Sequence, residues 1–254
     1  MTFPPLDTRF VGQSLIYFPE TDSTNDRAWA ALADFPANGT CFVTDYQSKG
    51  RGQRNNKWLS LPGQNLLFSV LLYPTFLSID QIFQLTKITA LAVRQTVQEF
   101  LPQHLCSIKW PNDILLNYKK VAGILIENQF SGSTILASVL GIGLNLNQTT
   151  FEHNATYQPT SFFLETKQEF DRAKVFAKLL KNIELWYEHL QNNRTLVNRE
   201  YLTHLLGFQE KRSYQNNTGE FEGYIIGVET NGRLAIQIQN TVRYFEFKEI
   251  EFVL

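Results

Sequence analysis

Apolar and polar positions alternate in ways that predict both helices and strands in the first third of the chain. Polar residues 22–25 precede the apolar run 28–32, which indicates a capped short helix that ends before Pro36. Residues 41–44 read as a strand, and residues 65–73 are apolar on both faces, as in a buried central strand. The polar, basic stretch between these two strands is therefore expected to be a loop.

The middle of the chain predicts a long helix followed by several short strands. Ser78 and Gln81 form a capping box, and apolar residues at helical spacing continue to about Phe100. Extended runs then follow at residues 107–110, 114–117, 121–126 and 134–140, separated by polar turns. We expect neighbouring runs to pair antiparallel. Together these elements predict a mixed sheet with helices on one side.

The last third of the chain changes pattern. A second amphipathic helix is indicated by the apolar positions Val175, Leu179, Ile183, Trp186 and Leu190. After Gly207 the chain becomes a series of short alternating segments, and Asn231-Gly232 lies between two of them as a hairpin turn. We therefore predict an α+β fold with a catalytic-sized domain over residues 1–206 and a small β-barrel over residues 207–254.

Composition narrows the classes of function. The 254 residues are 43% hydrophobic and carry a formal net charge of −1, so they can fill a core but show no basic excess for nucleic acid or membrane binding. Cys41 and Cys106 lie in apolar stretches without a CxxC motif, which argues against a zinc site or catalytic thiol. The chain shows neither a leader nor a membrane-spanning run, and we expect a cytoplasmic protein.

The basic loop, residues 49–58, is the first candidate site. It places four cations and two glycines in ten residues, so that backbone amides and guanidinium groups can gather around a phosphate or carboxylate. Taken alone, such a run is more often a solvated loop. It is not a GxxxxGK[ST] phosphate loop, and residues 141–145 lack the third glycine of a dinucleotide fingerprint.

Three further motifs have both a bland and a functional interpretation. Residues 109–113, Lys-Trp-Pro-Asn-Asp, form either a simple turn or a polar strand end that faces a ligand. Lys120 is either an edge-strand lysine or a ligand-facing cation, with Gly123 leaving room for a close approach. Ser23 and Thr24 either cap a helix or bind a ligand. Their joint occurrence in this order, with Gln47 and the basic loop, favours one site.

The ordered set resembles the signature segments of biotin–protein ligases. The segments are Ser23-Thr24-Asn25, Gly50-Arg51-Gly52 with Trp58, Lys109 to Asp113, Lys120 to Glu127 and Gly141 to Asn145. The resemblance implies a class II synthetase-like catalytic domain followed by an SH3-like domain. It also implies that biotin and MgATP give biotinyl-5'-adenylate, from which biotin passes to a lysine of a biotin carboxyl carrier domain of acetyl-CoA carboxylase or a related carboxylase.

The resemblance also implies roles for individual residues. Lys120 and Arg51 would be catalytic, with Lys120 holding the biotin carboxylate and α-phosphate. Asp113 would be a magnesium or phosphate-side group. Biotin would be bound by Ser23, Thr24, Asn25, Gln47, Arg51, Gly52, Gln53, Lys120 and Gly123, and the nucleotide by Arg54, Trp58, Asn112 and Asn145.

Two features separate this chain from other members of that family, and three alternatives stay open. Gln53 stands where the family often has a second arginine, and Ser23 comes too early for a preceding winged-helix repressor domain. The alternatives are a lipoate–protein ligase or octanoyltransferase, for which the expected Arg-Arg-x-Ser-Gly-Gly-Gly stretch is missing, and a non-catalytic binding module. An exposed strand edge would serve either a homodimer or the acceptor.

Overall fold

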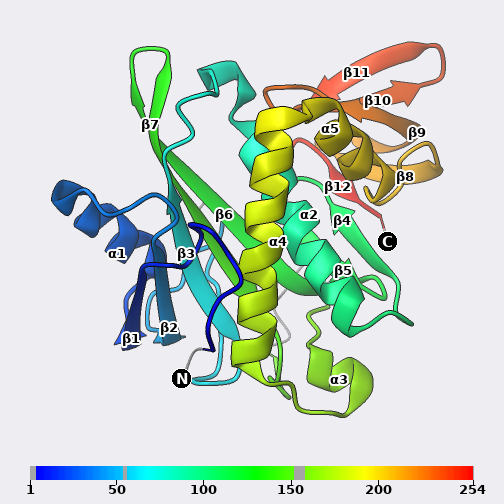
Figure 1. Ribbon diagram of the computed structural model, residues 1–254. Coiled ribbons are helices and arrows are strands. Elements are labelled where there is room, and N and C mark those ends of the chain that lie inside the picture. The colour runs from blue at the N-terminus through cyan, green and yellow to red at the C-terminus, as the bar shows by residue number, and fades with distance from the viewer. Residues whose placement is uncertain (1–3, 54–55, 152–157, 254) are drawn as a thin grey trace.

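A seven-stranded mixed sheet forms the centre of the molecule (Figure 1). The computed structural model describes residues 4–53, 56–151 and 158–253. The strand order is β1-β2-β3-β7-β6-β5-β4, in which only β1 and β2 pair parallel. The strands are β1 (Leu15–Thr21), β2 (Cys41–Gln47), β3 (Leu66–Leu72), β4 (Cys106–Lys109), β5 (Asp113–Leu116), β6 (Lys119–Ser131) and β7 (Thr134–Leu144).

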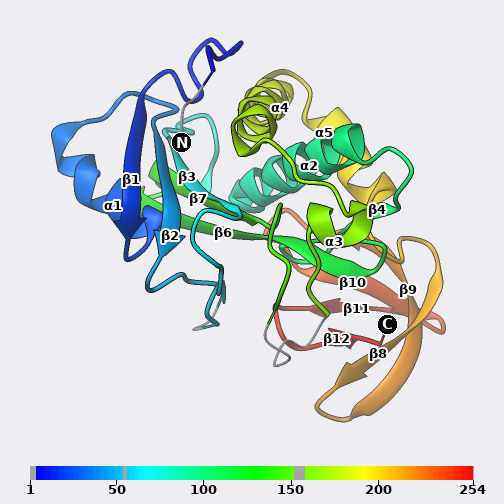
Figure 2. The ribbon, with the colours of Figure 1, turned by 90° about the horizontal axis from the view of Figure 1, so that it is seen from below.

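One face of this sheet is covered by α2 (Phe83–Phe100), α4 (Arg172–Asn192) and α5 (Arg194–Thr203). All residues of β3 are buried because both of its faces are covered, as its sequence predicted. Val70 and Leu72 point into the main core with α2 and α4, whereas Leu71 points to the opposite face. Figure 2 shows these helices as one layer on the sheet.

The opposite face is covered in part by α1 (Thr24–Ala31), which differs from the prediction of helices on one side only. Ala28 of α1 packs with Phe42 and Leu71 in a small separate core. The short helix α1 continues as the 3-10 helix η1 (Leu32–Asp34) and ends before Pro36, as predicted. It lies over β2, β3 and β7, so its N-terminus is placed beside the face that the large helices leave uncovered.

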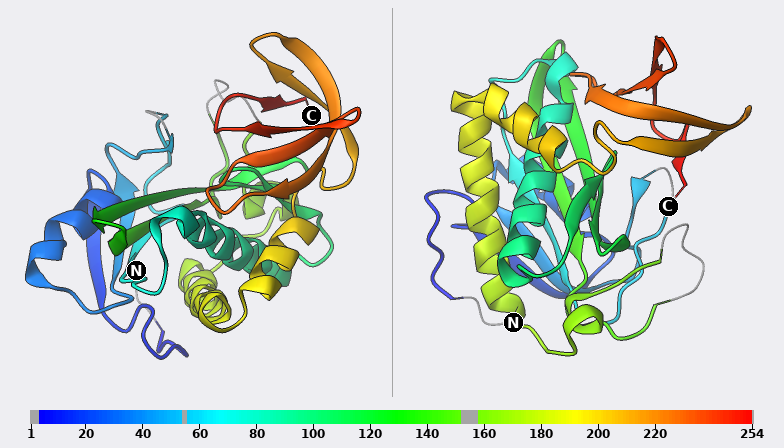
Figure 3. Two further views of the ribbon diagram at one scale, coloured as in Figure 1. Left: turned by 90° about the horizontal axis from the view of Figure 1, so that it is seen from above. Right: turned by 90° about the vertical axis from the view of Figure 1, so that its right-hand side faces the viewer.

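The C-terminal part forms a five-stranded antiparallel sheet of order β11-β10-β9-β8-β12. Its strands are β8 (Lys211–Asn216), β9 (Gly219–Val228), β10 (Leu234–Ile238), β11 (Thr241–Phe245) and β12 (Glu251–Phe252). The predicted hairpin at Asn231-Gly232 is confirmed between β9 and β10. Figures 2 and 3 show this sheet at the β4–β5 end of the central sheet, on the side away from α2 and α4.

The two sheets are joined through Trp110, which is 2% exposed. Its Nε1 donates to the Gly232 carbonyl oxygen at 2.9 Å, and its ring packs edge-on against Phe247 with centroids 5.2 Å apart. Because Trp110 follows β4 directly, the C-terminal sheet is attached at the strand end that carries the Lys-Trp-Pro-Asn-Asp motif.

Most predicted elements are confirmed, including the capping box of Ser78 and Gln81 before α2, where the first turn is the 3-10 helix η3 (Ile79–Gln81). The pattern did not predict β1, α3 (Phe162–Thr166) or α5. Pro19 lies within β1, which is tolerated because β1 is an edge strand. Over the described residues, every helix is too short or too polar to cross a membrane.

Candidate active site

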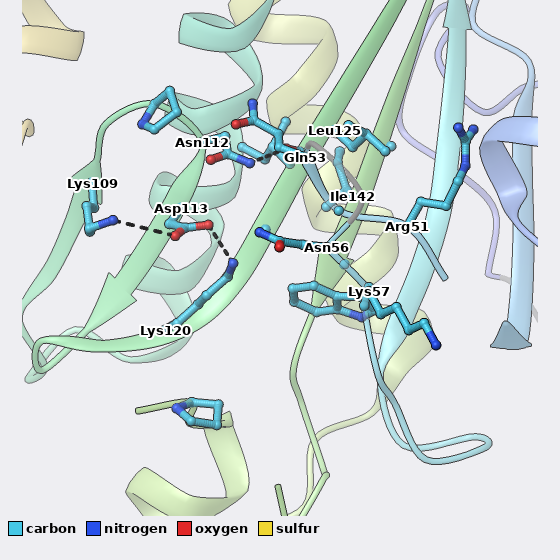
Figure 4. Close-up of a pocket in the computed structure, with 18 of the residues that line it drawn as sticks. Arg51, Gln53, Asn56, Lys57, Lys109, Asn112, Asp113, Lys120, Leu125 and Ile142 are labelled. Atoms are coloured by element: carbon cyan, nitrogen blue, oxygen red, sulfur yellow. Dashed lines mark hydrogen bonds and ion pairs between the residues drawn. The ribbon is translucent and has the colours of Figure 1, made fainter. Parts of the chain in front are cut away.

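A cavity of about 580 Å³ lies on the face of the central sheet opposite α2 and α4. Its walls come from the N-terminus of α1, the basic loop, the segment after β4 and the C-terminal residues around β12. Figure 4 shows the part of the cavity around Lys120. The volume is within the usual range for a small-molecule site. The motifs that the sequence singled out at widely separated positions therefore meet in one place.

The floor of the cavity is built from two rows of residues that cross the sheet. In one row Lys109, Asp113, Gly123 and Gly143 are cross-strand partners in turn, on β4, β5, β6 and β7. In the next row Leu125, Gly141, Ser69 and Phe42 are partners on β6, β7, β3 and β2. Because side chains alternate along a strand, each row presents its members to this face of the sheet; Ser69 and Phe42 lie at the α1 side and outside the cavity lining, and the glycines make the floor flat.

Lys120 reaches this face because of a β-bulge in β6. Ile114 pairs with Ala122, but the next residue, Leu115, pairs with Lys120, so Val121 has no partner in β5. Without the extra residue, Lys120 would point with Ala122 into the main core; with it, the side chain lines the cavity beside Gly123. Strand β6 is interior to the sheet, so the edge-strand interpretation of Lys120 is wrong.

Two lysines flank one buried carboxylate. Lys120 Nζ lies 2.7 Å from Asp113 Oδ1, and Lys109 Nζ lies 3.8 Å from Asp113 Oδ2 (Figure 4). Burial lowers the pKa of Lys109, an effect that the carboxylate of Asp113 opposes and the charge of Lys120 reinforces. Two ammonium groups thus share the single carboxylate of Asp113, with Glu251 as a second acidic residue that acts on Lys109, and the ammonium groups can bind an anion at this end of the cavity.

At the other end of the cavity, Ser23 and Gln47 keep hydrogen-bonding groups that a ligand can use. Ser23 is the N-cap of α1 but its side chain makes no cap hydrogen bond among the described residues, so its hydroxyl is left for a ligand. Gln47 Oε1 accepts from both the backbone N–H and the hydroxyl of Thr24, at 2.8 and 3.1 Å. Because Oε1 is fixed in this way, the Nε2 of Gln47 remains a donor for the cavity.

Thr24 and Asn25, two predicted ligand contacts, line the cavity and are also hydrogen-bonded within the protein. The Ser69 hydroxyl shares its proton between them, 2.7 Å from Thr24 Oγ1 and 2.6 Å from Asn25 Oδ1. Asn25 Nδ2 donates to Glu127 Oε2 at 2.8 Å. The sequence reasoning missed Ser69, although a lone hydroxyl in the apolar strand Leu66–Leu72 was a usable signal.

The basic loop folds back on itself above the glycine floor. Arg51 and Lys57 form an isolated antiparallel bridge, and Gly52 N–H donates to the Asn56 carbonyl at 2.6 Å. The Gly52 amide is therefore used within the loop, while Gly52 itself lines the cavity. Gln53 lines the cavity, whereas the predicted nucleotide contact Arg54 lies outside the described residues.

Trp58 lies on the glycine floor. A Cβ at Gly143 would overlap its indole ring, and one at Gly123 would come within 2.8 Å of Cζ3. Lys120 Nζ lies 5.7 Å from the ring centroid, and the buried indole N–H has no hydrogen-bond partner among the described residues. The space that Gly123 was predicted to leave is thus taken by an aromatic ring that borders the Lys120–Asp113 pair.

Arg51 was predicted to be catalytic, but its guanidinium points away from Lys120 (Figure 4). Its NH1 and NH2 groups bind the two carboxylate oxygens of Glu127 at 2.9 Å each, and NH2 also lies 2.7 Å from Asp26 Oδ1. The carboxylates of Glu127 and Asp26 therefore hold the Arg51 guanidinium, although Glu127 lies 76 residues away in the sequence. Arg51 would have to leave both of them before it could contact a reacting group near Lys120.

The two predicted nucleotide contacts Asn112 and Asn145 differ in their hydrogen bonding. Asn112 Nδ2 donates to the Ile124 carbonyl at 2.7 Å, which ties the segment after β4 to β6. Asn145 Nδ2 donates to the Thr160 carbonyl at 3.0 Å, but its buried Oδ1 has no partner among the described residues. Because a buried oxygen without a partner is costly, Asn145 is the better candidate for accepting a ligand N–H.

The C-terminal segment contributes a wall that the sequence reasoning did not anticipate. Lys109 Nζ lies 5.4 Å from the ring centroid of Phe252, so the lysine is buried under an aromatic ring of the second sheet. No local motif marks this segment, because its place at the cavity depends on how the two sheets pack. The lining residues from this part of the chain are Phe247, Lys248, Ile250, Glu251 and Phe252.

The described residues contain no cluster of three or more His, Cys, Asp or Glu side chains that could hold a metal ion. Asp113, the predicted magnesium or phosphate-side group, is ion-paired to two lysines. Burial raises the pKa of both cysteine thiols, that of Cys106 to about 12, so neither thiolate is favoured.

Comparison with known proteins shows the family of this chain. Residues 17–145 match the model of the biotin/lipoate A/B protein ligase family. The chain is 30% identical to the bifunctional ligase/repressor BirA of Bacillus spizizenii, covering 97% of this chain and 76% of that protein. It is also 30% identical to the biotin–[acetyl-CoA-carboxylase] ligase of Paracoccus denitrificans, over 85% of this chain and 91% of that protein.

A solved structure supports the same assignment over nearly the whole chain. Biotin protein ligase from Aquifex aeolicus, in complex with biotin and ATP, superposes with a TM-score of 0.77 at 28% identity, covering 94% of this chain and 98% of that one. The resemblance predicted from the motifs is thereby confirmed, and the chain belongs to the biotin/lipoate A/B protein ligase family.

Proposed function

We propose that this protein is an ATP-dependent ligase that forms biotinyl-5'-AMP from biotin and ATP and then transfers biotin to a lysine of a biotin carboxyl carrier domain. The acceptor would belong to acetyl-CoA carboxylase or a related carboxylase. The observation that carries the proposal is one cavity with free hydrogen-bonding groups at one end and a lysine pair at the other, in a chain whose relatives are biotin ligases.

The spacing along β6 suits a substrate with a polar ring and a distant carboxylate. Asn25 contacts the backbone at Leu125, whereas Lys120 lies about 15 Å along the strand at the rise of an extended chain. In the proposed binding mode the biotin ring lies at the Ser23 and Gln47 end, where a hydroxyl and an amide N–H are available. Its carboxylate would then point toward Lys120 past the Trp58 ring, which covers Gly123 and Gly143.

The first step forms a bond between a biotin carboxylate oxygen and the α-phosphorus of ATP, while the bond to the leaving pyrophosphate breaks. Negative charge collects on the phosphoryl oxygens, and the ammonium groups of Lys120 and Lys109 stabilise it. Asp113 holds both lysines on the cavity side. In the second step the acceptor amine attacks the biotinyl carbonyl carbon and AMP leaves, so no covalent intermediate with the enzyme is required.

Magnesium is expected to accompany ATP, but the side chains do not build a cage for it. The carboxylates that line the cavity are Asp113 and Glu251, and Asp113 is already paired with two cations. Magnesium is commonly held by few carboxylates together with substrate phosphates and water.

Intact-mass measurement of an acceptor tests the proposal. The protein is incubated with MgATP, a competent biotin carboxyl carrier domain and either biotin, lipoate or octanoate. A biotinyl-sized increase on the acceptor lysine supports the proposed function. Addition of lipoate or octanoate would assign the chain to the other branch of its family, and no addition would favour a non-catalytic binding module.

A further inference from the structure

We propose that Glu127 is a positioning residue that holds the basic loop and the Ser23–Gln47 end of the cavity in register with each other. It does not line the cavity itself. Four N–H groups converge on its carboxylate: two from Arg51, one from Asn25 and one from the Trp29 indole. They come from the basic loop and from α1, so a single side chain of β6 joins two walls of the site.

The contact with Arg51 fixes the loop. Its guanidinium and the carboxylate form a two-pronged pair, with both distances at 2.9 Å. The side chains are 40% exposed for Arg51 and 29% exposed for Glu127, so the pair is only partly screened by solvent. Arg51 is directly bridged to Lys57, the neighbour of Trp58, and Trp58 N–H donates to the Gly50 carbonyl. Holding Arg51 therefore holds Trp58 on the glycine floor.

The contact with Asn25 decides which groups donate and which accept in the hydrogen bonds that lead to the cavity. A carboxylate can only accept, so Asn25 must present Nδ2 to Glu127 and Oδ1 to the Ser69 hydroxyl. Ser69 in turn reaches Thr24, whose hydroxyl and N–H point at Gln47 Oε1. The chain of hydrogen bonds ends with Gln47 Nε2 as a donor toward the cavity.

This inference rests on the proposed function and predicts which kinetic constant changes. Glu127→Gln keeps the size of the side chain but removes the charge and introduces an N–H group among four donors. The KM for biotin should rise about fivefold to tenfold, between the effects expected for exposed ion pairs and for buried charged hydrogen bonds. The kcat at saturating biotin should stay within about twofold, because Lys120 and Asp113 do not contact Glu127.

One variant and its control separate the effect of the Arg51 contact on the loop from the effect of the Asn25 contact on the hydrogen bonds at the cavity. Asp26→Asn removes the second carboxylate on Arg51 without touching Asn25, and it should speed hydrogen exchange of the Trp58 amide with a smaller change in KM. Asp22→Asn is the matched control, because Asp22 pairs with Lys49 of the same loop in an exposed contact at 3.2 Å. It should leave both measurements unchanged.

A double-mutant cycle with Arg51→Lys tests the link between the two residues. If Glu127 acts on the loop through Arg51, Glu127→Gln should speed hydrogen exchange of the Trp58 amide when Arg51 is present. In the Arg51→Lys background, where exchange is already faster, Glu127→Gln should add little further acceleration. An unchanged KM in Glu127→Gln, or a parallel fall of kcat and thermal stability without a KM effect, would overturn the positioning role. Should Glu127→Gln fail to fold, Arg51→Lys must still speed Trp58 amide exchange, and normal exchange overturns the inference.

The readouts also distinguish this inference from the proposed function. Wild-type protein that biotinylates its acceptor, beside a Glu127→Gln variant that equals it, overturns the inference alone. Wild-type protein that never biotinylates a competent acceptor overturns the function, whereas amide exchange at Trp58 still tests the Arg51–Glu127 contact without any ligand.

Discussion

Lys87 on α2 offers a quantitative test of the packing behind the site. It is 3% exposed, and its Nζ donates to Asn198 Oδ1 at 2.8 Å, between the rings of Phe83 and Tyr201 at 5.9 and 5.7 Å. Among the described residues, no carboxylate forms an ion pair with it. Burial lowers the pKa of Lys87 from 10.5 to about 8, because the charged form loses its hydration.

The sign of the pH effect follows from the proton count. Below pH 8 Lys87 is protonated in both the folded and the unfolded protein. The cost of burying the charge then lowers the free energy of unfolding by the full amount that corresponds to the pKa difference. Between pH 8 and 10.5 the unfolded chain binds more protons, so stability rises with pH. The full difference corresponds to about 3 kcal/mol, of which about 2 kcal/mol is regained by pH 9.5.

Lys87→Met removes the charge and nearly preserves the volume. At pH 7 we expect it to raise the free energy of unfolding by about 2 kcal/mol, since about 1 kcal/mol is lost with the hydrogen bond to Asn198. Asn198 Oδ1 still accepts from Gln84 Nε2 at 3.1 Å. Urea unfolding at pH 7 and 9.5 measures the difference between wild type and variant, which should shrink by about 2 kcal/mol at the higher pH.

The exposed Lys174 on α4 provides the control. Lys174→Met should show the same difference from wild type at both pH values. A difference for Lys87→Met that is also independent of pH, or a variant less stable than wild type at pH 7, would refute the reasoning. It would mean that the two aromatic rings and Asn198 keep Lys87 protonated at no net cost.

Three predictions concern the site itself. Lys120→Ala should reduce adenylate formation, measured as pyrophosphate release, by at least about a hundredfold with an unchanged thermal midpoint, whereas Lys119→Ala should retain activity; normal turnover would remove Lys120 from the site. Gln53→Arg should slow adenylate release in single-turnover experiments, because it adds a fixed positive charge to the loop that lines the cavity; equal release rates in the two proteins would contradict this. Trp110→Phe should cost about 2 kcal/mol in urea unfolding, because the buried Gly232 carbonyl loses its donor; a wild-type midpoint would contradict this.

Local sequence was sufficient where one element carries its own signal. The capping box at Ser78, the apolar spacing of α2 and α4 and the hairpin at Asn231-Gly232 are short-range patterns, and each predicted element is present. The motifs also predicted that Lys120 would face a ligand site. Elements with few buried residues were missed, as in α5, where only Val197 and Tyr201 are buried.

Tertiary structure alone decided which groups are used by the protein and which are left for a ligand. Arg51 and Glu127 are 76 residues apart, and Trp110 and Gly232 are 122 apart, so no local pattern could pair them. The bulge at Val121, which aims Lys120 at the cavity, exists only in the register of β6 against β5. The sequence by itself determined the residue types and the elements that carry them, because helical and strand periodicity are local. The direction of each charged side chain was decided by packing, because charges pair with whatever the fold brings near.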